Sequence, residues 1–290
     1  MKGIILAAGK GTRLYPATEA VCKPLLTVYD KPMIYYPLSL MIDAGIRDIM
    51  IIIPPGEEER FEKLLGDGFH LGISIRYKIQ YKARGIGDAF IIGRDFIERD
   101  KVCLALGDNI FYHENLSDFI RKAGEIREGA SVFGCWSENP EAFGVVEFDE
   151  KGTAVSLEEK PERPRSHYVV PGLYFYGGAV AERAARLLPS ARGELEITDI
   201  NRGFLEEGRL KVTVLPKDTV WFDAGTAEGV IKAGVKIMEL QKNGRYIGCV
   251  EEAAYRRGFI CRERLEALGR RMKASDYGRY VAGIARGRTG

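Results

Sequence analysis

The chain has 290 residues, of which 46% are hydrophobic and 29% are charged, as is typical of a globular protein with a sizeable core. Its 43 lysines and arginines nearly balance 41 aspartates and glutamates, which leaves a formal net charge of +2. This balance gives no general reason to expect affinity for nucleic acid or for an anionic membrane, so a polyanion would have to be bound at a local site.

The first half of the chain alternates apolar runs with amphipathic segments. Four runs are apolar enough for strands covered on both faces: residues 3–8, 48–53, 73–79 and 102–106. Helices are predicted over residues 31–44, 57–65 and 86–97, and a glycine follows each of the first two. Strands that alternate with helices predict a mostly parallel sheet in an α/β layer.

The middle of the chain changes character, because strand-like runs follow one another without long helices between them. These runs are residues 130–136, 144–148, 154–159 and 168–176, and they predict antiparallel additions to the sheet. Helices are then expected over residues 178–188 and 195–207. Beyond residue 226 the chain is expected to be largely helical, over residues 227–243, 251–257 and 262–271.

A glycine-rich loop, with the sequence LAAGKGTRL at residues 6–14, directly follows the first predicted strand. Ligands of open α/β sheets bind beyond the carboxyl ends of the strands, so the loop lies where a site is expected. Gly9 and Gly11 let backbone N–H groups approach a phosphate. Three nearby cations suit a triphosphate: Lys10, Arg13 and Lys23.

Two better-known phosphate loops do not fit these residues. A dinucleotide-binding loop needs a third small residue where Leu14 stands, and a Walker A loop needs Ser or Thr where Gly11 stands. An ordinary strand-to-helix turn remains as the alternative, and the additional Thr12, Arg13 and Lys23 argue against it.

Two aspartates stand in turns where they could hold a metal ion. Asp108 follows the apolar run at residues 102–106, and Asp223 lies in the sequence WFDAGT at residues 221–226. Mg²⁺ is usually bound by one or two carboxylates together with substrate phosphates. The alternative is that each aspartate only caps a turn or a helix.

Further segments resemble the sugar nucleotidyltransferase family, also called sugar-1-phosphate pyrophosphorylases. They are DKPMIYYP at residues 30–37, LGDN at 106–109, FGVVEF at 143–148, EEKP at 158–161 and RGELEITD at 192–199. The resemblance covers essentially the whole chain, in the expected order. It is greatest to family members that use dTTP and glucose 1-phosphate and that carry a C-terminal helical region.

The resemblance implies a Rossmann-like α/β fold: a mixed, mostly parallel sheet with helices on both faces, antiparallel additions and a helical C-terminal region. It also implies Mg²⁺-assisted transfer of dTMP from dTTP to glucose 1-phosphate, which gives dTDP-glucose and pyrophosphate. Transfer from UTP or to another sugar 1-phosphate remains an alternative, as does an inactive sensor of nucleotide sugars. No nucleic-acid or membrane partner is expected.

Roles for individual residues follow from the same resemblance. The catalytic residues are expected to be Arg13, Lys23, Asp108, Lys160 and Asp223, with Asp108 and Asp223 as the metal ligands. The nucleotide is expected to contact Leu6, Ala8, Gly9, Gly11, Thr12, Arg13, Gln80, Gly85 and Asp108. The sugar phosphate is expected to contact Asn109, Gly144, Glu159, Lys160, Val170, Arg192 and Trp221.

Three positions depart from the family pattern. Pro24 stands where glutamine is frequent, Phe143 where a sugar-contacting tyrosine is common, and Ala8 where glycine is frequent. These departures concern the preference for base and sugar more than the type of reaction. Gln80 can both donate and accept hydrogen bonds, so it suits the N3–H and O4 of thymine or of uracil.

The C-terminal segment at residues 249–256 resembles the part of the longer family members that builds a second, regulatory nucleotide site between subunits. Tyr112, Glu252 and Arg256 are expected in that site, although His113 replaces a residue that is usually glycine. We therefore predict a homotetramer. Residues 1–243 are interpreted as the catalytic domain, with a nucleotide-binding half over about 1–128 and a sugar-phosphate half over about 129–226. Residues 244–290 are interpreted as a helical regulatory or oligomerisation element.

The cysteines and the start of the chain indicate the compartment. The five cysteines, Cys22, Cys103, Cys135, Cys249 and Cys261, include no Cys-x-x-Cys pair, so neither a zinc site nor a disulfide framework is indicated. The apolar run at residues 4–8 is too short for a signal peptide, and no stretch approaches the length of a membrane span. We expect a soluble cytoplasmic protein.

Overall fold

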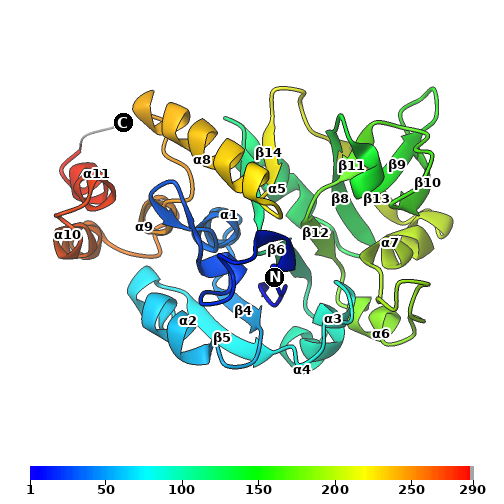
Figure 1. The fold of residues 1–290 in the computed structure, drawn as a ribbon, viewed down its shortest axis with the longest axis horizontal. Coiled ribbons are helices and arrows are strands. Elements are labelled where there is room, and N and C mark those ends of the chain that lie inside the picture. Colours follow the sequence, from blue (N-terminus) through cyan, green and yellow to red (C-terminus); the bar gives the residue numbers. More distant parts are fainter. Residues whose placement is uncertain (288–290) are drawn as a thin grey trace.

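The apolar runs of the first half form the parallel part of one large sheet in the computed structural model, which describes residues 1–287 (Figure 1). Its strands run in the order β6 (Val102–Leu106), β1 (Lys2–Leu6), β4 (Asp48–Ile53) and β5 (Ser74–Ile79). In β4, Ile49 and Ile51 belong to the core on one face of the sheet, and Met50 and Ile52 to the core on the other. Burial on both faces is what a continuous apolar run predicts.

The strands of the middle segment extend this sheet in antiparallel fashion, so the predicted mixed α/β sheet is confirmed. Beyond β6 they follow in the order β12 (Leu173–Tyr176), β8 (Ala130–Trp136), β11 (Tyr168–Val170), β9 (Gly144–Phe148) and β10 (Ala154–Glu159). The strand predicted over residues 168–176 is divided at Pro171, which cannot donate a ladder hydrogen bond. A strand that was not predicted, β13 (Leu210–Val214), pairs parallel to β8.

Helices cover both faces of the sheet. One face packs against α1 (Tyr35–Asp43), α2 (Glu58–Leu65) and α5 (Leu116–Gly124), and the other against α3 (Asp88–Ile92), α4 (Arg94–Ile97), α6 (Val180–Ala184) and α7 (Ile197–Glu206). Short 3-10 turns are η1 (Thr12–Leu14), η2 (Lys23–Leu25), η3 (Phe69–Leu71) and η4 (Pro140–Ala142).

Two predicted helices differ from the structure. The helix predicted over residues 31–44 begins only at Tyr35, because β3 (Lys31–Pro32) pairs with β2 (Thr27–Val28) in a hairpin. The helix predicted over residues 86–97 is divided into α3 and α4 at Gly93. A Cβ at Gly93 would lie 2.6 Å from the Met50 side chain and 3.0 Å from that of Ile4, so the chain passes too close to the sheet for a side chain there.

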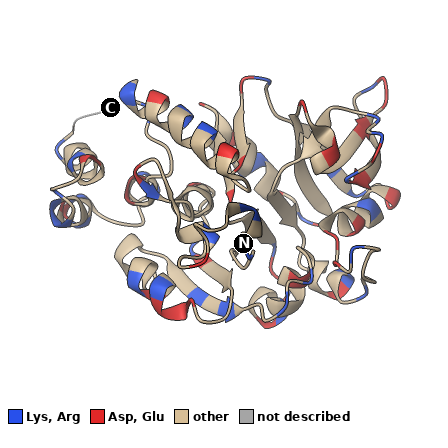
Figure 2. Cartoon of the chain, viewed as in Figure 1, with Lys and Arg blue, Asp and Glu red and all other residues tan. Residues whose placement is uncertain are grey.

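A two-stranded ribbon lies apart from the main sheet. It pairs β7 (Asn109–Tyr112) antiparallel with β14 (Val220–Asp223), and neither strand was predicted. The chain then enters α8 (Ala227–Lys242), whose N-cap Thr226 accepts a hydrogen bond from the Gly229 N–H through its side chain. Residues of both charges are spread along α8 (Figure 2).

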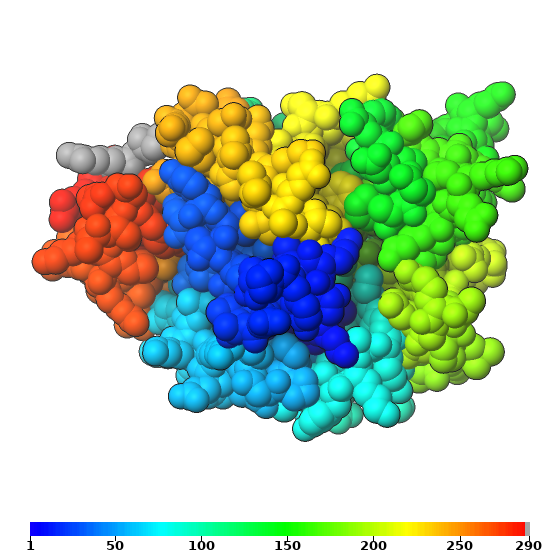
Figure 3. All heavy atoms as spheres, in the orientation of Figure 1, coloured from blue at the N-terminus to red at the C-terminus, as the bar shows by residue number. Residues whose placement is uncertain are grey.

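The C-terminal region is helical, as predicted, and contains α9 (Val250–Arg256), α10 (Arg262–Arg271) and α11 (Asp276–Ala285). Figure 3 shows these helices at the end of the molecule opposite the antiparallel strands. The sequence did not predict α11, whose two glycines lower its helix propensity. Residues 288–290 of the predicted C-terminal element lie outside the described residues. Within residues 1–287, no helix has the length and apolar character that crossing a membrane requires.

A buried lysine connects the N-terminal hairpin to the end of α8. Lys31 is only 2% exposed, and its Nζ lies 2.5 Å from Asp30 Oδ1 and 2.8 Å from Gln241 Oε1. Gln241 Nε2 in turn donates to Asp30 Oδ2 at 2.9 Å, which closes a ring of three side chains. The ammonium group also lies 5.2 Å from the ring centre of Tyr36 and 5.5 Å from that of Tyr277 in α11. Burial lowers the pKa of Lys31, and Asp30 opposes that shift.

We expect Lys31→Met to destabilise the protein, because it leaves Asp30 and Gln241 without their shared cation. The free energy of unfolding should fall by roughly 3 kcal/mol, at the lower end of the range for a broken buried pair since Asp30 keeps some contact with water. The measurement is urea unfolding followed by circular dichroism. Lys232→Met is the matched control, because Lys232 pairs with Glu228 on the exposed side of α8. Equal midpoints for the two variants would contradict a structural role for the ring.

Candidate functional site

The loops that follow β1 and β6 meet at the carboxyl edge of the parallel strands. Leu6 pairs with Leu106 in register, and Gly107 N–H donates to the carbonyl of Leu6 at 2.9 Å. The glycine-rich loop and Asp108 are therefore neighbours. In Figure 3 the surface is hollowed between the N-terminal segment and the segment of the antiparallel strands.

The glycine-rich loop folds back on the segment that carries Lys23. Gly11 has a φ of 63°, and a Cβ there would lie 2.9 Å from Thr18 Cγ2 and 3.1 Å from Lys23 Cβ. Thr18 Oγ1 donates to the carbonyl of Gly11 at 2.8 Å and holds the turn. Thr12 and Arg13 are exposed. Glycine is therefore favoured at position 11 both because the backbone has a positive φ and because a side chain would clash with Thr18 and Lys23.

Two carboxylates lie beside each other because β7 and β14 are paired. The register sets Asp223 opposite Asn109, and Ala224 N–H donates to the carbonyl of Asp108 at 3.0 Å. Burial raises the pKa of Asp223, and the negative charge of Asp108 raises it further. The structure thus brings together the two predicted metal ligands, which are 115 positions apart in the sequence.

Two cations offset this negative charge. Lys23 is 6% exposed and its Nζ forms an ion pair with Asp108 Oδ2. Gly225 lies between Arg13 and Asp223. A Cβ added to it would be 2.6 Å from Arg13 Nη2 and 2.9 Å from Asp223 Oδ1, so the guanidinium group and the carboxylate are close to each other. Both cations lower the pKa of Asp223 against the effect of burial.

Asn109 holds Asp108 in place. Its Nδ2 donates to Asp108 Oδ1 at 2.9 Å, while its Oδ1 accepts from Gly172 N–H at 3.0 Å and from Trp221 Nε1 at 2.8 Å. Two donors on the oxygen fix which way the amide faces. Because Asn109 is 3% exposed, its contacts orient Asp108 and Trp221. The sequence predicted only a contact with the sugar phosphate at this position.

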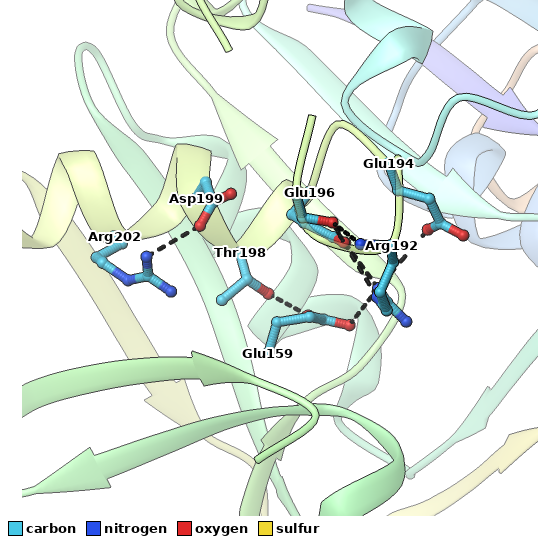
Figure 4. Close-up of polar contacts among 8 residues, drawn as sticks. Glu159, Arg192, Glu194, Glu196, Thr198, Asp199 and Arg202 are labelled. Atoms are coloured by element: carbon cyan, nitrogen blue, oxygen red, sulfur yellow. Dashed lines mark hydrogen bonds and ion pairs between the residues drawn. The ribbon is translucent and has the colours of Figure 1, made fainter. Parts of the chain in front are cut away.

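Two of the predicted sugar-phosphate residues, Glu159 and Arg192, point toward each other near the end of β10 (Figure 4). Glu159 accepts a hydrogen bond from Thr198 Oγ1 and lies 3.4 Å from Arg192 Nη2. Burial raises the pKa of Glu159, and the hydrogen bond from Thr198 opposes the shift. Gly144 lies against the same pair, since a Cβ there would be 2.9 Å from Thr198 Oγ1.

The two cations of this cluster differ in their surroundings. Arg192 is held by carboxylates: its Nη2 lies 2.8 Å from Glu196 Oε2, and its Nε 3.2 Å from Glu196 Oε1. Lys160 is exposed, has a φ of 46°, and forms no ion pair with any of residues 1–287. A non-glycine residue in this conformation is strained, and such strain is concentrated at functional sites.

An apolar wall on this side is formed by Trp221 together with Phe143. Trp221 packs edge-on against Phe143 with ring centres 5.0 Å apart. Val170 is 8% exposed and belongs to the core that packs against α3, α6 and α7, whereas Phe143 and Trp221 pack against the core on the other face. Phe143, which departs from the family pattern, thus supports the ring of Trp221.

Gln80 and Gly85 flank the loop that follows β5. Gln80 is 7% exposed, and its Nε2 donates to Asp88 Oδ2 at 2.9 Å. Next to Gly85, the Arg84 carbonyl accepts from Leu195 N–H at 2.7 Å. This hydrogen bond ties the predicted base-binding loop to the segment that carries Arg192. Leu6 and Ala8 lie at the end of β1, Leu6 half-buried and Ala8 buried.

The three predicted regulatory residues line one cavity of about 1060 Å³ between α1, α5 and the C-terminal helices. Tyr112 contributes to one wall, while Glu252 and Arg256 project from α9. Arg256 Nη2 lies 2.7 Å from Asp43 Oδ1, and Tyr280 donates to Glu252 Oε2 at 2.9 Å. The structure therefore brings these three residues together.

The two carboxylates of Asp108 and Asp223 suit Mg²⁺, which is usually bound by few protein ligands, better than a metal ion that is bound by protein side chains alone. Among residues 1–287 no group of three or more His, Cys, Asp or Glu side chains is arranged to hold an ion. Asp108 and Asp223 instead form an adjacent pair whose mutual repulsion a divalent cation would relieve. Two carboxylates completed by phosphate oxygens are a usual environment for Mg²⁺.

Three residues that support the site were not assigned from the sequence. Thr198 and Glu196 hold Glu159 and Arg192, and both lie in the segment at residues 192–199 that carried the family resemblance. The family resemblance of that segment indicated that its residues matter, but it did not indicate that Thr198 contacts Glu159 or that Glu196 contacts Arg192. Asp88, the partner of Gln80, begins the short helix α3 and has no such signal.

Comparison with known proteins gives a consistent result. Residues 2–239 match the family model described as nucleotidyl transferase. The chain is 51% identical to the glucose-1-phosphate thymidylyltransferase of Neisseria meningitidis, over 97% of this chain and 98% of that protein. It is 49% identical to the protein of the same name from Xanthomonas campestris, over 98% of this chain and 97% of that protein.

Two solved structures share the fold of this chain. A putative glucose-1-phosphate thymidylyltransferase from Bacillus anthracis, crystallised with sucrose, superimposes with a TM-score of 0.76 at 39% identity and covers 81% of this chain and 94% of its own. A UDP-glucose pyrophosphorylase in complex with UDP-glucose superimposes with a TM-score of 0.72, covering 82% of this chain and 98% of its own. At 22% identity it supports the fold alone.

We expect Asp223→Asn to stabilise the metal-free protein. The pKa of Asp223 is higher in the folded than in the unfolded chain. The folded protein is therefore most stable while this carboxyl is protonated, and its free energy of unfolding falls as the pH rises through the folded pKa. An asparagine does not ionise and avoids this loss. In EDTA at neutral pH the variant should therefore melt at a higher temperature than the wild type, and the difference should vanish in acid.

The same variant should lose its response to Mg²⁺. Added Mg²⁺ should raise the melting temperature of the wild type by ligand linkage and leave the Asp223→Asn variant almost unchanged. Asp218→Asn is the control, because Asp218 is exposed and outside the carboxylate pair. A variant that melts below the wild type in EDTA would contradict the repulsion between the two carboxylates.

Proposed function

The chain belongs to the nucleotidyl transferase family, and we propose that it transfers a thymidylyl group from dTTP to glucose 1-phosphate. The products are dTDP-glucose and pyrophosphate. One observation carries the proposal: the glycine-rich loop, the carboxylate pair and the cluster around Glu159 lie at neighbouring strand ends. Glu159 pairs with Gly144, which also pairs with Val170, and Gly172 shortly after bonds to both Leu106 and Asn109. Relatives named for this activity align with nearly the whole chain.

The chemistry requires no general base. An oxygen of the sugar phosphate, already anionic, attacks the α-phosphorus of the triphosphate in line with the bond to the β-phosphate. That P–O bond breaks, and its electron pair leaves with pyrophosphate. The obstacle is repulsion between two anions, so catalysis has to come from positioning and from positive charge.

The cations of the site are divided between the two reactants. Arg13 and Lys23, beside the glycine-rich loop, would bind the triphosphate and stabilise the leaving pyrophosphate, together with backbone N–H groups of Gly9, Gly11 and Thr12. Lys160 and Arg192 would bind the phosphate of the sugar. Because Glu196 already holds the guanidinium of Arg192, that side chain is positioned before the substrate arrives.

Asp108 and Asp223 would hold a Mg²⁺ ion. When bound, the ion supplies charge neutralisation on the phosphates. Asn109 donates to the Asp108 carboxylate and accepts from the indole of Trp221, so it would keep the metal ligand and the sugar pocket in a fixed relation.

Recognition of the sugar and the base falls to separate residues. Glu159 would accept hydrogen bonds from sugar hydroxyls, and Thr198 keeps its carboxylate in one orientation. Gly144, Val170 and Trp221 would line the sugar pocket. Gln80 would read the edge of the pyrimidine, with Gly85 and Leu6 beside the base and Ala8 close to the phosphates.

The C-terminal region supports two further proposals. The cavity lined by Tyr112, Glu252 and Arg256 is proposed to bind a regulatory nucleotide, and the subunits are proposed to form a homotetramer around it. The domain boundaries after residues 128, 226 and 243 stay predictions. A cytoplasmic location is proposed from the cysteines, all five of which are free thiols and four of which are buried.

The reaction is tested by measuring pyrophosphate release for a grid of nucleoside triphosphates against sugar 1-phosphates, with Mg²⁺. We expect the highest kcat/KM with dTTP and glucose 1-phosphate. Asp108→Ala should lower kcat by about 10²–10³, the usual effect of removing one electrostatic contact to the reacting groups. Higher activity with UTP would instead identify a uridylyltransferase. No release with any pair would indicate an inactive sensor of nucleotide sugars.

Lys160→Met tests the sugar-phosphate side separately. We expect KM for glucose 1-phosphate to rise and kcat to fall, while KM for dTTP changes little, because Lys160 is proposed to contact only the sugar phosphate. Steady-state kinetics with each substrate varied in turn provides the measurement. Lys151→Met, in an exposed turn before β10, is the control and should behave as the wild type. A selective rise in KM for dTTP would show that Lys160 serves the other substrate.

A further inference from the structure

The side-chain amide of Gln80 is held by a buried carboxylate. Gln80 Nε2 donates to Asp88 Oδ2 at 2.9 Å, and Arg84 Nη2 lies 2.5 Å from the other oxygen, Asp88 Oδ1. Asp88 is 2% exposed and Gln80 is 7% exposed, whereas the side chain of Arg84 is 53% exposed. A buried carboxylate is costly unless it is paired, and these two contacts provide its partners.

The contact with Asp88 decides which way the amide faces. An ionised carboxylate only accepts hydrogen bonds, so Nε2 of Gln80 has to face it, and the opposite orientation would set two acceptors against each other. The backbone of Gln80 is also fixed, because its N–H donates to the carbonyl of Ile53 at 2.9 Å. The amide therefore has one defined order of donor and acceptor.

The amide oxygen is left for a ligand. Within residues 1–287 no hydrogen bond to Gln80 Oε1 is present, and this atom is not one of the fully buried polar atoms without a partner, which are Ser131 Oγ and Thr219 Oγ1. Oε1 therefore retains some solvent-accessible surface, although the residue as a whole is 7% exposed. It presents an acceptor beside the second N–H of the same amide.

We infer that Asp88 is a positioning residue that makes the base pocket select thymine or uracil over cytosine, by fixing the orientation of the Gln80 amide. Thymine and uracil present N3–H as a donor next to O4 as an acceptor. Cytosine presents the reverse order, with N3 as an acceptor next to its amino group. An amide that cannot turn over matches the first pattern and sets its oxygen against N3 of cytosine. This inference rests on the proposed function of Gln80 in reading the base.

Asp88→Asn is the sharpest variant, because it keeps the size of the side chain. Arg84 would hold the oxygen of the new amide at position 88, so the nitrogen of that amide would face Gln80 and draw Oε1 toward it. Gln80 would then present the reversed order to the base. A merely structural role for Asp88 would weaken the binding of all pyrimidine nucleotides alike, whereas the inference predicts a change for cytosine relative to the other two.

The test is isothermal titration calorimetry of the full chain with dTTP, UTP and dCTP, without sugar phosphate. We expect the wild type to bind dCTP about 10- to 100-fold more weakly than dTTP, the discrimination expected of one bidentate pair. In Asp88→Asn this ratio should fall at least about tenfold, while the ratio of dTTP to UTP stays constant because these bases share the same edge. Arg94→Gln is the control, since Arg94 is exposed on the neighbouring helix α4, and it should keep the wild-type ratio of dTTP to dCTP.

An unchanged ratio of dTTP to dCTP in a folded Asp88→Asn variant would overturn the inference. If that variant does not fold, Asp88→Ala is titrated with dTTP and dCTP instead, because it removes the acceptor that holds Gln80 Nε2 and leaves the amide free to turn over. A smaller preference for dTTP over dCTP than in the wild type would support the inference, and an unchanged preference would overturn it. Failure of the proposed reaction is distinguishable, because it appears as absent pyrophosphate release while the binding ratios still follow this pattern.

Discussion

Two neighbouring carboxylates form the constraint on which the rest of this site depends. Asp108 and Asp223 are held together by the pairing of β7 with β14, and burial combined with mutual repulsion raises the pKa of Asp223. The folded state can hold two neighbouring carboxylates because the positive charges of Lys23 and Arg13 lie beside them and offset their repulsion. A site that holds unfavourable charge in the absence of its ligand gains affinity for a divalent cation and for the phosphates that come with it.

Side-chain amides at this site are oriented by their neighbours. Asn109 is fixed by two donors on its oxygen, from Gly172 and Trp221, and so directs its nitrogen to Asp108. Gln80 is fixed in the opposite way, by the acceptor Asp88 on its nitrogen. An amide without such a partner can turn over at little cost and cannot distinguish a donor from an acceptor. The defined order of donors and acceptors therefore comes from these second contacts.

The two halves of the site are joined by backbone as well as by side chains. Leu195 N–H donates to the Arg84 carbonyl, which links the loop after β5 to the segment of Arg192. Asn109 links the carboxylate pair to the wall formed by Trp221 and Phe143. Reactants bound at separate loops are thereby held at a constant spacing, which in-line displacement requires.

The sequence by itself determined the main sheet and the chemical groups of the site. Strands such as β4 and β8 were located to the residue, because burial on both faces requires a continuous apolar run, which is a local signal. The short strands β7 and β14 were missed, since only partners from distant parts of the chain stabilise them. Only the tertiary structure decided which residues hold the functional groups in place, such as Asp88 on Gln80 and Thr198 on Glu159. The physical reason is that a hydrogen bond depends on distance and direction within a few tenths of an ångström, whereas sequence patterns report burial and periodicity along one element.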